Sequence, residues 1–129
     1  MGINNYKVVF YVDEHDACPV EDFLYSLDPK MAAAVTRWLK TLERHGPEIK
    51  YFKGASSYLE DGIFELRVMF SSNITRLFYY YYDDIKGLIV VTHGFVKKSK
   101  KTPPGEIERA KHYRACFNYE RSMHHGGNA

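Results

Sequence analysis

The chain has 129 residues, a length typical of a single domain. Hydrophobic residues make up 45% of it and charged residues 26%, which excludes a wholly disordered chain. No apolar run approaches the roughly 18–20 residues of a membrane helix, and the first residues carry no signal-peptide pattern. Two cysteines, Cys18 and Cys116, are too few for a disulfide framework. We therefore expect a cytoplasmic protein in which both cysteines are free thiols.

Charge divides the chain into two parts. Residues 1–92 contain 10 lysines and arginines against 13 acidic residues, whereas residues 93–129 contain 8 against 3. The C-terminal third is therefore basic, although the whole chain has a formal net charge of only +2. A basic segment on a near-neutral body indicates an anionic partner, although a solvated helix and tail would explain the same composition.

The first 60 residues predict one strand, two helices and a loop. Residues 6–12 (YKVVFYV) are β-branched and aromatic, which is typical of a buried strand. Pro19 can begin a short helix, and the Asp-Pro pair at 28–29 predicts a second helix that runs to about His45. Residues 47–60 show no clear period, so we expect a connecting loop there.

The rest of the chain predicts strands and then a helix. Three apolar runs separated by short turn-forming segments are expected to pair as antiparallel hairpins: residues 63–70, 74–82 and 88–96. A last helix is expected to begin near Pro103. The predicted order β-α-α-β-β-β-α is an α+β fold, with an antiparallel sheet that carries the helical hairpin on one face. We expect one domain over residues 1–119 and a flexible tail over residues 120–129.

Spacing within the central hairpin brings two arginines together. If Ser71 and Ser72 form a two-residue turn, Arg67 lies directly opposite Arg76, and a turn one residue later makes the arginines diagonal neighbours. In either register both side chains share one face of the sheet. Because adjacent like charges destabilise each other, the pair suggests an anion between them, or neutralisation of Arg67 by Glu65 or another carboxylate.

The two faces of this hairpin differ in character. One face is apolar and is expected to pack the helices: Phe64, Leu66, Val68, Phe70, Leu77, Tyr79 and Tyr81. The arginine face also carries three aromatic rings: Phe78, Tyr80 and Tyr82.

A basic segment follows the last predicted strand, which itself contains His93. Its lysines are Lys97, Lys98, Lys100 and Lys101. A cationic surface with aromatic rings suits RNA, because cations bind phosphates and rings stack on unpaired bases. It also suits cleavage by a 2′-hydroxyl attacking the adjacent phosphate, in which arginines stabilise developing charge and another side chain moves protons. This chemistry requires no metal or cofactor, and no metal-site spacing is present. A solvated loop is the alternative explanation of the lysines.

Five segments are distinctive: residues 18–24 (CPVEDFL), 61–67 (DGIFELR), 75–79 (TRLFY), 93–103 (HGFVKKSKKTP) and 106–110 (EIERA). Together with the predicted element order, they resemble the RelE/ParE toxin superfamily and, in particular, its phage-derived, HigB-like branch. The resemblance extends from about residue 6 to residue 113. The GFVKK run followed by KTP is its most specific part.

The resemblance implies the toxin of a type II toxin–antitoxin pair. Such RelE- and HigB-like toxins are metal-independent endoribonucleases that cut mRNA at the ribosome. The implied partners are mRNA, the ribosome and a helix-turn-helix antitoxin.

The same resemblance assigns roles to residues. Arg76 matches the strand arginine at the scissile phosphate, and Arg67 falls on a frequently basic position. Lys97 or Lys98 matches the basic residue that ends the last strand. The proton carrier is left open between His93 and the C-terminal residues His112, Tyr113 and Tyr119. Further RNA contacts are expected from Lys100, Lys101, Tyr80, Tyr113 and His112.

Two other functions are compatible with this pattern. ParE-like relatives share the fold but bind DNA gyrase without cleaving anything, so the basic face would dock on an acidic protein. An inactive module that keeps only the antitoxin-binding surface is the second alternative.

Overall fold

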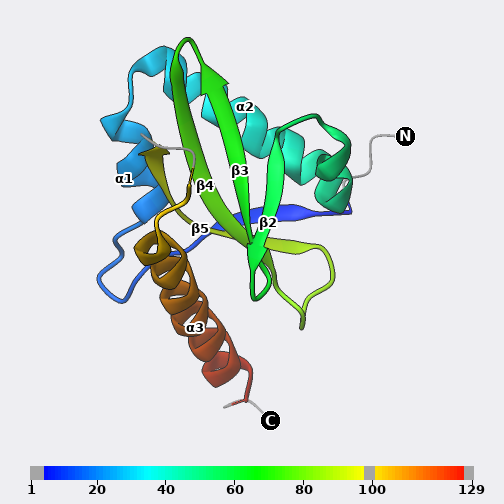
Figure 1. Ribbon diagram of the computed structural model, residues 1–129. Helices are drawn as coiled ribbons and strands as arrows, with labels where there is room; N and C mark the ends of the chain where they lie inside the picture. The colour runs from blue at the N-terminus through cyan, green and yellow to red at the C-terminus, as the bar shows by residue number, and fades with distance from the viewer. Residues whose placement is uncertain (1–4, 98–100, 127–129) are drawn as a thin grey trace.

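The computed structural model describes residues 5–97 and 101–126 (Figure 1). The strands of these residues form one sheet in the order β1-β5-β4-β3-β2. Their bounds are β1 Lys7–Phe10, β2 Ser56–Glu60, β3 Ile63–Phe70, β4 Asn73–Tyr81 and β5 Leu88–Lys97. The helices are α1 Pro19–Ser26, α2 Pro29–His45, the short 3₁₀ helix η1 Gly46–Tyr51 and α3 Pro104–Gly126. The α+β class predicted from the sequence is confirmed.

The sheet is mixed, and the prediction of a purely antiparallel sheet is wrong at one edge. β1 pairs with β5 in parallel, with Lys7 opposite Leu88, whereas the other neighbouring strands are antiparallel. Along the sequence, however, β1 and β5 are separated by all the other strands and by α1 and α2. No short turn therefore fixes the relative direction of these two strands. The prediction relied on hydrophobic periodicity and turn residues, which indicate only how neighbouring segments of the chain connect.

The prediction of a loop over residues 47–60 is also wrong. This segment contains η1 and β2, and β2 pairs with β3 as an edge strand with a register shift near Tyr58. The turn that joins them has Asp61 and Gly62 at φ 51° and 78°. Two successive positive φ values are typical of the type I′ hairpin turn, which an Asp-Gly pair favours.

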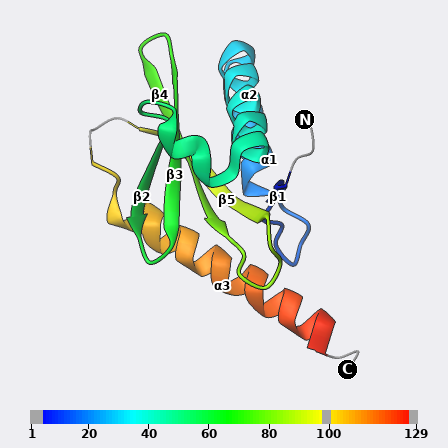
Figure 2. The ribbon, with the colours of Figure 1, turned by 90° about the vertical axis from the view of Figure 1, so that its right-hand side faces the viewer.

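Helices cover both faces of the sheet. Figure 2 shows α1 and α2 on one side of the strands and α3 on the other. Behind the first face lies a core that includes Val35, Leu42, Leu66 and Leu77. Behind the second face lies a smaller core that includes Ile63, Phe78, Ile107 and Ala110. Both faces of the β3–β4 hairpin are therefore packed, including the part around Phe78 of the face that carries the arginines.

Local signals explain the helix ends. The Asp28 side chain accepts a hydrogen bond from the backbone N–H of Lys30 at 2.9 Å, and Pro29 begins α2 as predicted. Gly46, at φ 55°, follows His45, the last residue of α2. α3 continues to Gly126, through much of the segment for which the sequence predicts a tail. The guanidinium of Arg121 lies over the rings of Tyr82 and Phe117, which holds this part of α3 against the sheet.

Candidate functional site

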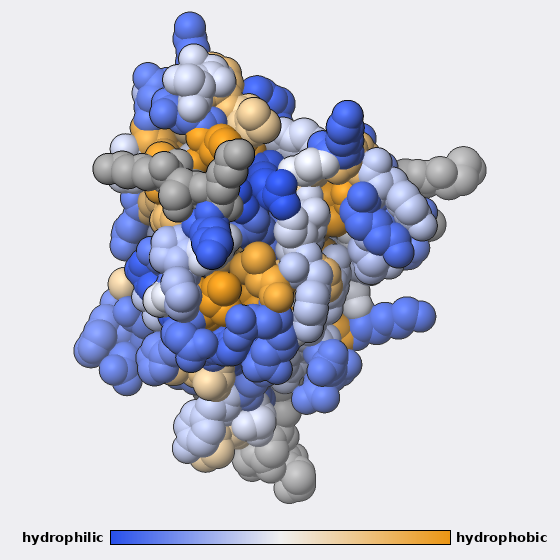
Figure 3. Space-filling model, viewed as in Figure 1, coloured by the Kyte–Doolittle hydropathy of each residue, from blue (hydrophilic) through white to orange (hydrophobic). Residues whose placement is uncertain are grey.

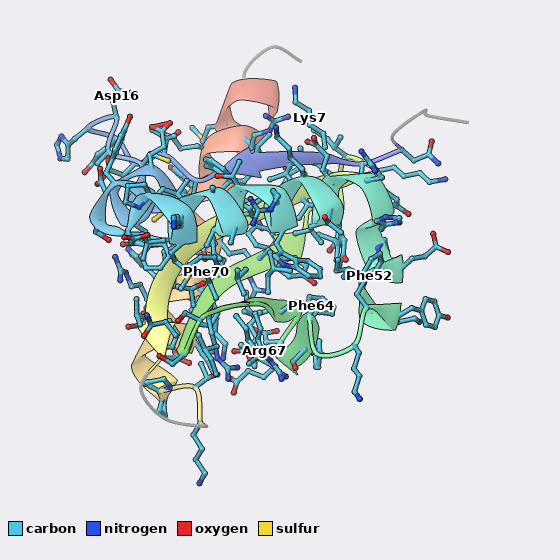
Figure 4. All side chains as sticks on the ribbon, turned by 90° about the horizontal axis from the view of Figure 1, so that it is seen from above. Lys7, Asp16, Phe52, Phe64, Arg67 and Phe70 are labelled. Carbon is cyan, nitrogen blue, oxygen red and sulfur yellow. The ribbon has the colours of Figure 1, made fainter. Side chains whose placement is uncertain are left out.

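Arg67 and Arg76 are direct cross-strand partners on β3 and β4. Phe70 pairs with Asn73, which confirms the two-residue turn at Ser71 and Ser72. Arg67 lies on the side of the sheet away from α2, whereas Phe64 and Phe70 lie on the side of α2 (Figure 4). The Arg67 side chain is 34% exposed and the Arg76 side chain only 8%. The pair thus joins one accessible and one buried cation.

The carboxylate of Glu65 contacts both arginines. Its Oε2 lies 3.2 Å from Arg67 Nε and also forms an ion pair with Arg76 Nη1. Only 1% of Glu65 is exposed, so the carboxylate sits under the protein surface. The adjacent arginines could be explained by a bound anion or by a carboxylate of the protein. In the structure, Glu65 is the carboxylate that partly neutralises them.

Two hydroxyl groups complete this cluster. Thr102, just before α3, donates a hydrogen bond from Oγ1 to Glu65 Oε1 at 2.7 Å. Ser57 on β2 accepts a hydrogen bond from Arg67 Nη2. We call Ser57, Glu65, Arg67, Arg76 and Thr102 the arginine cluster. It joins three strands to the segment that leads into α3, and Figure 3 shows hydrophilic side chains beside an apolar patch on this face.

Arg76 retains unused hydrogen-bonding capacity. Its Nε is buried and has no hydrogen-bond partner among the described residues. Burial lowers the pKa of Arg76 from its ordinary value, yet a guanidinium remains cationic at physiological pH. Buried donors without a partner are rare, and a functional role is one of the explanations for them. The cluster therefore has one net positive charge and, at Arg76 Nε, a buried donor with no acceptor among the described residues.

His93 lies on the same face but is enclosed. It pairs with Phe78 across β4 and β5, stacks on that ring at 4.7 Å and is 1% exposed. Its Nε2 lies 2.9 Å from Glu106 Oε1 on α3, and its Nδ1 lies 3.2 Å from Thr92 Oγ1. Burial, reinforced by the positive charge of Arg109, lowers the pKa of His93 to about 4. His93 is therefore neutral at pH 7 and holds Glu106 in place.

The predicted aromatic and histidine contacts gather at α3. Tyr80 is buried and donates its hydroxyl hydrogen to Asn118 Oδ1 at 2.9 Å, and burial raises its pKa. Tyr113 stacks on Tyr11 at 4.6 Å and accepts a hydrogen bond from Arg109. These two rings attach α3 to the sheet.

His112 and the lysines lie in different surroundings. His112 is exposed on α3, with Nε2 3.8 Å from Cys116 Sγ. Lys97 ends β5 and pairs with Ile74, two residues along the strands from the pairing of Arg76 with Phe95. Lys101 is exposed and directly precedes Thr102 of the arginine cluster. Lys98 and Lys100 lie outside the described residues.

Comparison with known protein families identifies the family of this chain. Residues 22–114 match the family described as phage derived protein Gp49-like (DUF891). The chain belongs to this family. The Gp49-like family falls within the RelE toxin-like group, so the superfamily resemblance seen in the sequence is confirmed at that level. No curated protein matches the chain.

The Gp49-like match covers the whole arginine cluster and its connection to α3. It ends within α3, at Arg114, whose guanidinium contacts Asp61 at the β2–β3 turn. Among the described residues no helix is both long and apolar enough to cross a membrane.

Sequence reasoning missed three residues of this site, and the first of them, Ser57, falls in the segment that was predicted to be a loop. Thr102 and Glu106 contact Glu65 and His93 across 37 and 13 residues of chain. Neither residue carries a local signal for such a contact. Glu65 did carry one, because it lies two residues before Arg67 on the same strand and therefore on the same face.

Proposed function

We propose that this Gp49-like chain is the toxin of a type II toxin–antitoxin pair, of the HigB-like branch, and that it cleaves mRNA at the ribosome. The observation that supports this most is the buried Arg76, which has a charge partner in Glu65 and whose Nε has no hydrogen-bond partner in the part of the chain that the structure describes. A phosphate oxygen is the acceptor that such a guanidinium binds well. Two basic residues lie close to the cluster along the chain, since Lys97 ends β5 and Lys101 directly precedes Thr102.

The proposed reaction is an internal transfer at phosphorus. The 2′-hydroxyl of the RNA loses its proton and attacks the adjacent phosphorus, and the bond to the 5′-oxygen breaks as that oxygen is protonated. The products are a 2′,3′-cyclic phosphate and a 5′-hydroxyl end. Arg76 stabilises the extra negative charge of the five-coordinate phosphorus, and Arg67 binds the neighbouring backbone.

Proton transfer is assigned to the start of α3. Both ring nitrogens of His93 have protein partners, and the ring is enclosed, so we give it a positioning role. Glu106 is 26% exposed, is held by His93 and lies four residues after Thr102. A carboxylate fixed in this way can accept the 2′-hydroxyl proton. His112, Tyr113 and Tyr119 lie further along α3 and are the alternatives.

The test uses purified protein added to a translation mixture with a defined message. We expect the wild type to cut within the coding region and leave 2′,3′-cyclic phosphate ends, and Arg76→Ala to lose at least about 100-fold of the rate. Arg37→Ala, a change of an exposed arginine on α2, is the matched control and should cut like the wild type. Equal cutting by Arg76→Ala would contradict the proposal. An intact message together with gyrase-dependent DNA breaks would favour the ParE-like alternative.

A further inference from the structure

Glu65 reduces the charge of the arginine cluster from two positive charges to one. Its carboxylate is 1% exposed and contacts Arg67, Arg76 and Thr102. Arg76 is itself buried, so water screens this group of charges only weakly. A ligand anion placed here must therefore nearly balance the charge that remains, because an unbalanced buried charge is strongly unfavourable.

We propose that Glu65 sets the charge of this site to match the single negative charge of an internal phosphodiester, and that it thereby rejects doubly charged terminal phosphates. This inference rests on the proposed function, in which RNA phosphate binds at Arg76. A bound diester leaves the cluster neutral, whereas a terminal phosphate monoester leaves one excess negative charge. Glu65 is on this account a specificity-determining residue that selects attack within an RNA chain over attack at its end.

Two small probes isolate the charge from the rest of the RNA. Dimethyl phosphate carries one charge, and methyl phosphate carries mostly two at pH 7.5, because the second pKa of a phosphate monoester is about 6. The midpoint of thermal unfolding is measured against the concentration of each probe at constant ionic strength. The ratio of the two apparent affinities reports how the site discriminates between the charges.

Four variants change the charge of the cluster in known steps. The wild type has one net positive charge, Glu65→Gln has two, Arg67→Met has none, and the double variant Glu65→Gln/Arg67→Met returns to one. We expect the preference for dimethyl phosphate to fall at least about tenfold in Glu65→Gln and to return to within about threefold of wild type in the double variant. Arg67→Met should bind neither probe measurably.

Controls keep the test decisive. Glu60→Gln removes a carboxylate that pairs with Lys111 outside the cluster and should leave the ratio unchanged. If Glu65→Gln does not fold alone, the double variant still tests the charge rule, because it leaves Arg76 beside a neutral amide. The same ratio in wild type and Glu65→Gln, a double variant unlike the wild type, or no binding of either probe by any variant would overturn the inference.

The two proposals fail separately. If the ratio follows the charge of the cluster while the message in the translation mixture stays intact, the nuclease proposal is wrong and the charge rule holds. If cleavage depends on Arg76 while the ratio ignores Glu65, the nuclease proposal holds and the charge rule is wrong.

Discussion

Arg67 and Arg76 face each other across β3 and β4, and a single buried carboxylate contacts both guanidiniums. Like charges at directly opposed strand positions are unfavourable, so this arrangement is stable only with a counter-ion. Glu65 provides it from two residues before Arg67 on the same strand. The chain thus holds two cations together with an anion of its own and still leaves one positive charge available.

Removal of the Glu65 carboxylate should be strongly destabilising. We expect Glu65→Ala to lower the free energy of unfolding by about 3–5 kcal/mol, because it leaves Arg76 buried without its partner. Glu60→Ala is the matched control: its pair with Lys111 is solvent-exposed and is worth about 1 kcal/mol or less. Urea denaturation measures both values. A loss from Glu65→Ala as small as that from Glu60→Ala would show that Arg76 does not need this counter-ion.

His93 should make stability depend on pH. Its pKa is about 4 in the folded chain and about 6.5 when unfolded, so the unfolded state binds more protons between these values. Stability is then full above about pH 6.5 and is lost as pH falls toward 4, by about 3 kcal/mol in total. His93→Gln should flatten this part of the pH profile, and His15→Gln, at an exposed histidine, should not. Unfolding curves at several pH values provide the measurement, and an unchanged slope in His93→Gln would refute the assignment.

Gly94 should resist substitution because α1 packs directly on it. A Cβ at this position of β5 would lie 2.7 Å from the ring of Phe23 and 3.2 Å from the backbone oxygen of Arg76. We expect Gly94→Ala to destabilise the protein by about 1–3 kcal/mol through overpacking. Gly105→Ala is the contrast, since nothing lies near its Cβ at the start of α3, and it should stabilise by a few tenths to about 1 kcal/mol. Thermal unfolding distinguishes the two, and equal midpoints would contradict the packing argument.

The sequence predicts the parts of the fold that local signals define. The start of α2 at Asp28 and Pro29, the strand β3 and the Arg67–Arg76 register all follow from caps, alternation and a two-residue turn. β2 was missed although Asp61 and Gly62 form a favoured hairpin turn, which requires a strand before it as well as after it. The parallel pairing of β1 with β5 has no local signal, because it depends on how the whole chain folds back.

In the candidate site, too, local sequence signals predict some features, whereas others depend on tertiary contacts. Alternation along β3 and β4 predicts that both arginines share a face and offers Glu65 as a partner. The enclosure of His93 and the contacts of Thr102 and Glu106 arise when α3 packs on the sheet, which depends on tertiary contacts that periodicity alone does not fix. The face that carries the arginines and Tyr80 is partly covered by α3, since the Tyr80 hydroxyl donates a hydrogen bond to Asn118.

We propose that the arginine cluster is the site at which this protein cleaves mRNA in cells. Controlled expression in a bacterial host, with mapping of mRNA 5′ ends, tests it most directly for wild type, Arg76→Ala and Arg37→Ala. The account predicts growth arrest and new 5′ ends inside translated coding regions for wild type and Arg37→Ala, and neither for a folded Arg76→Ala protein. Growth arrest by the wild type with no new 5′ ends would contradict it.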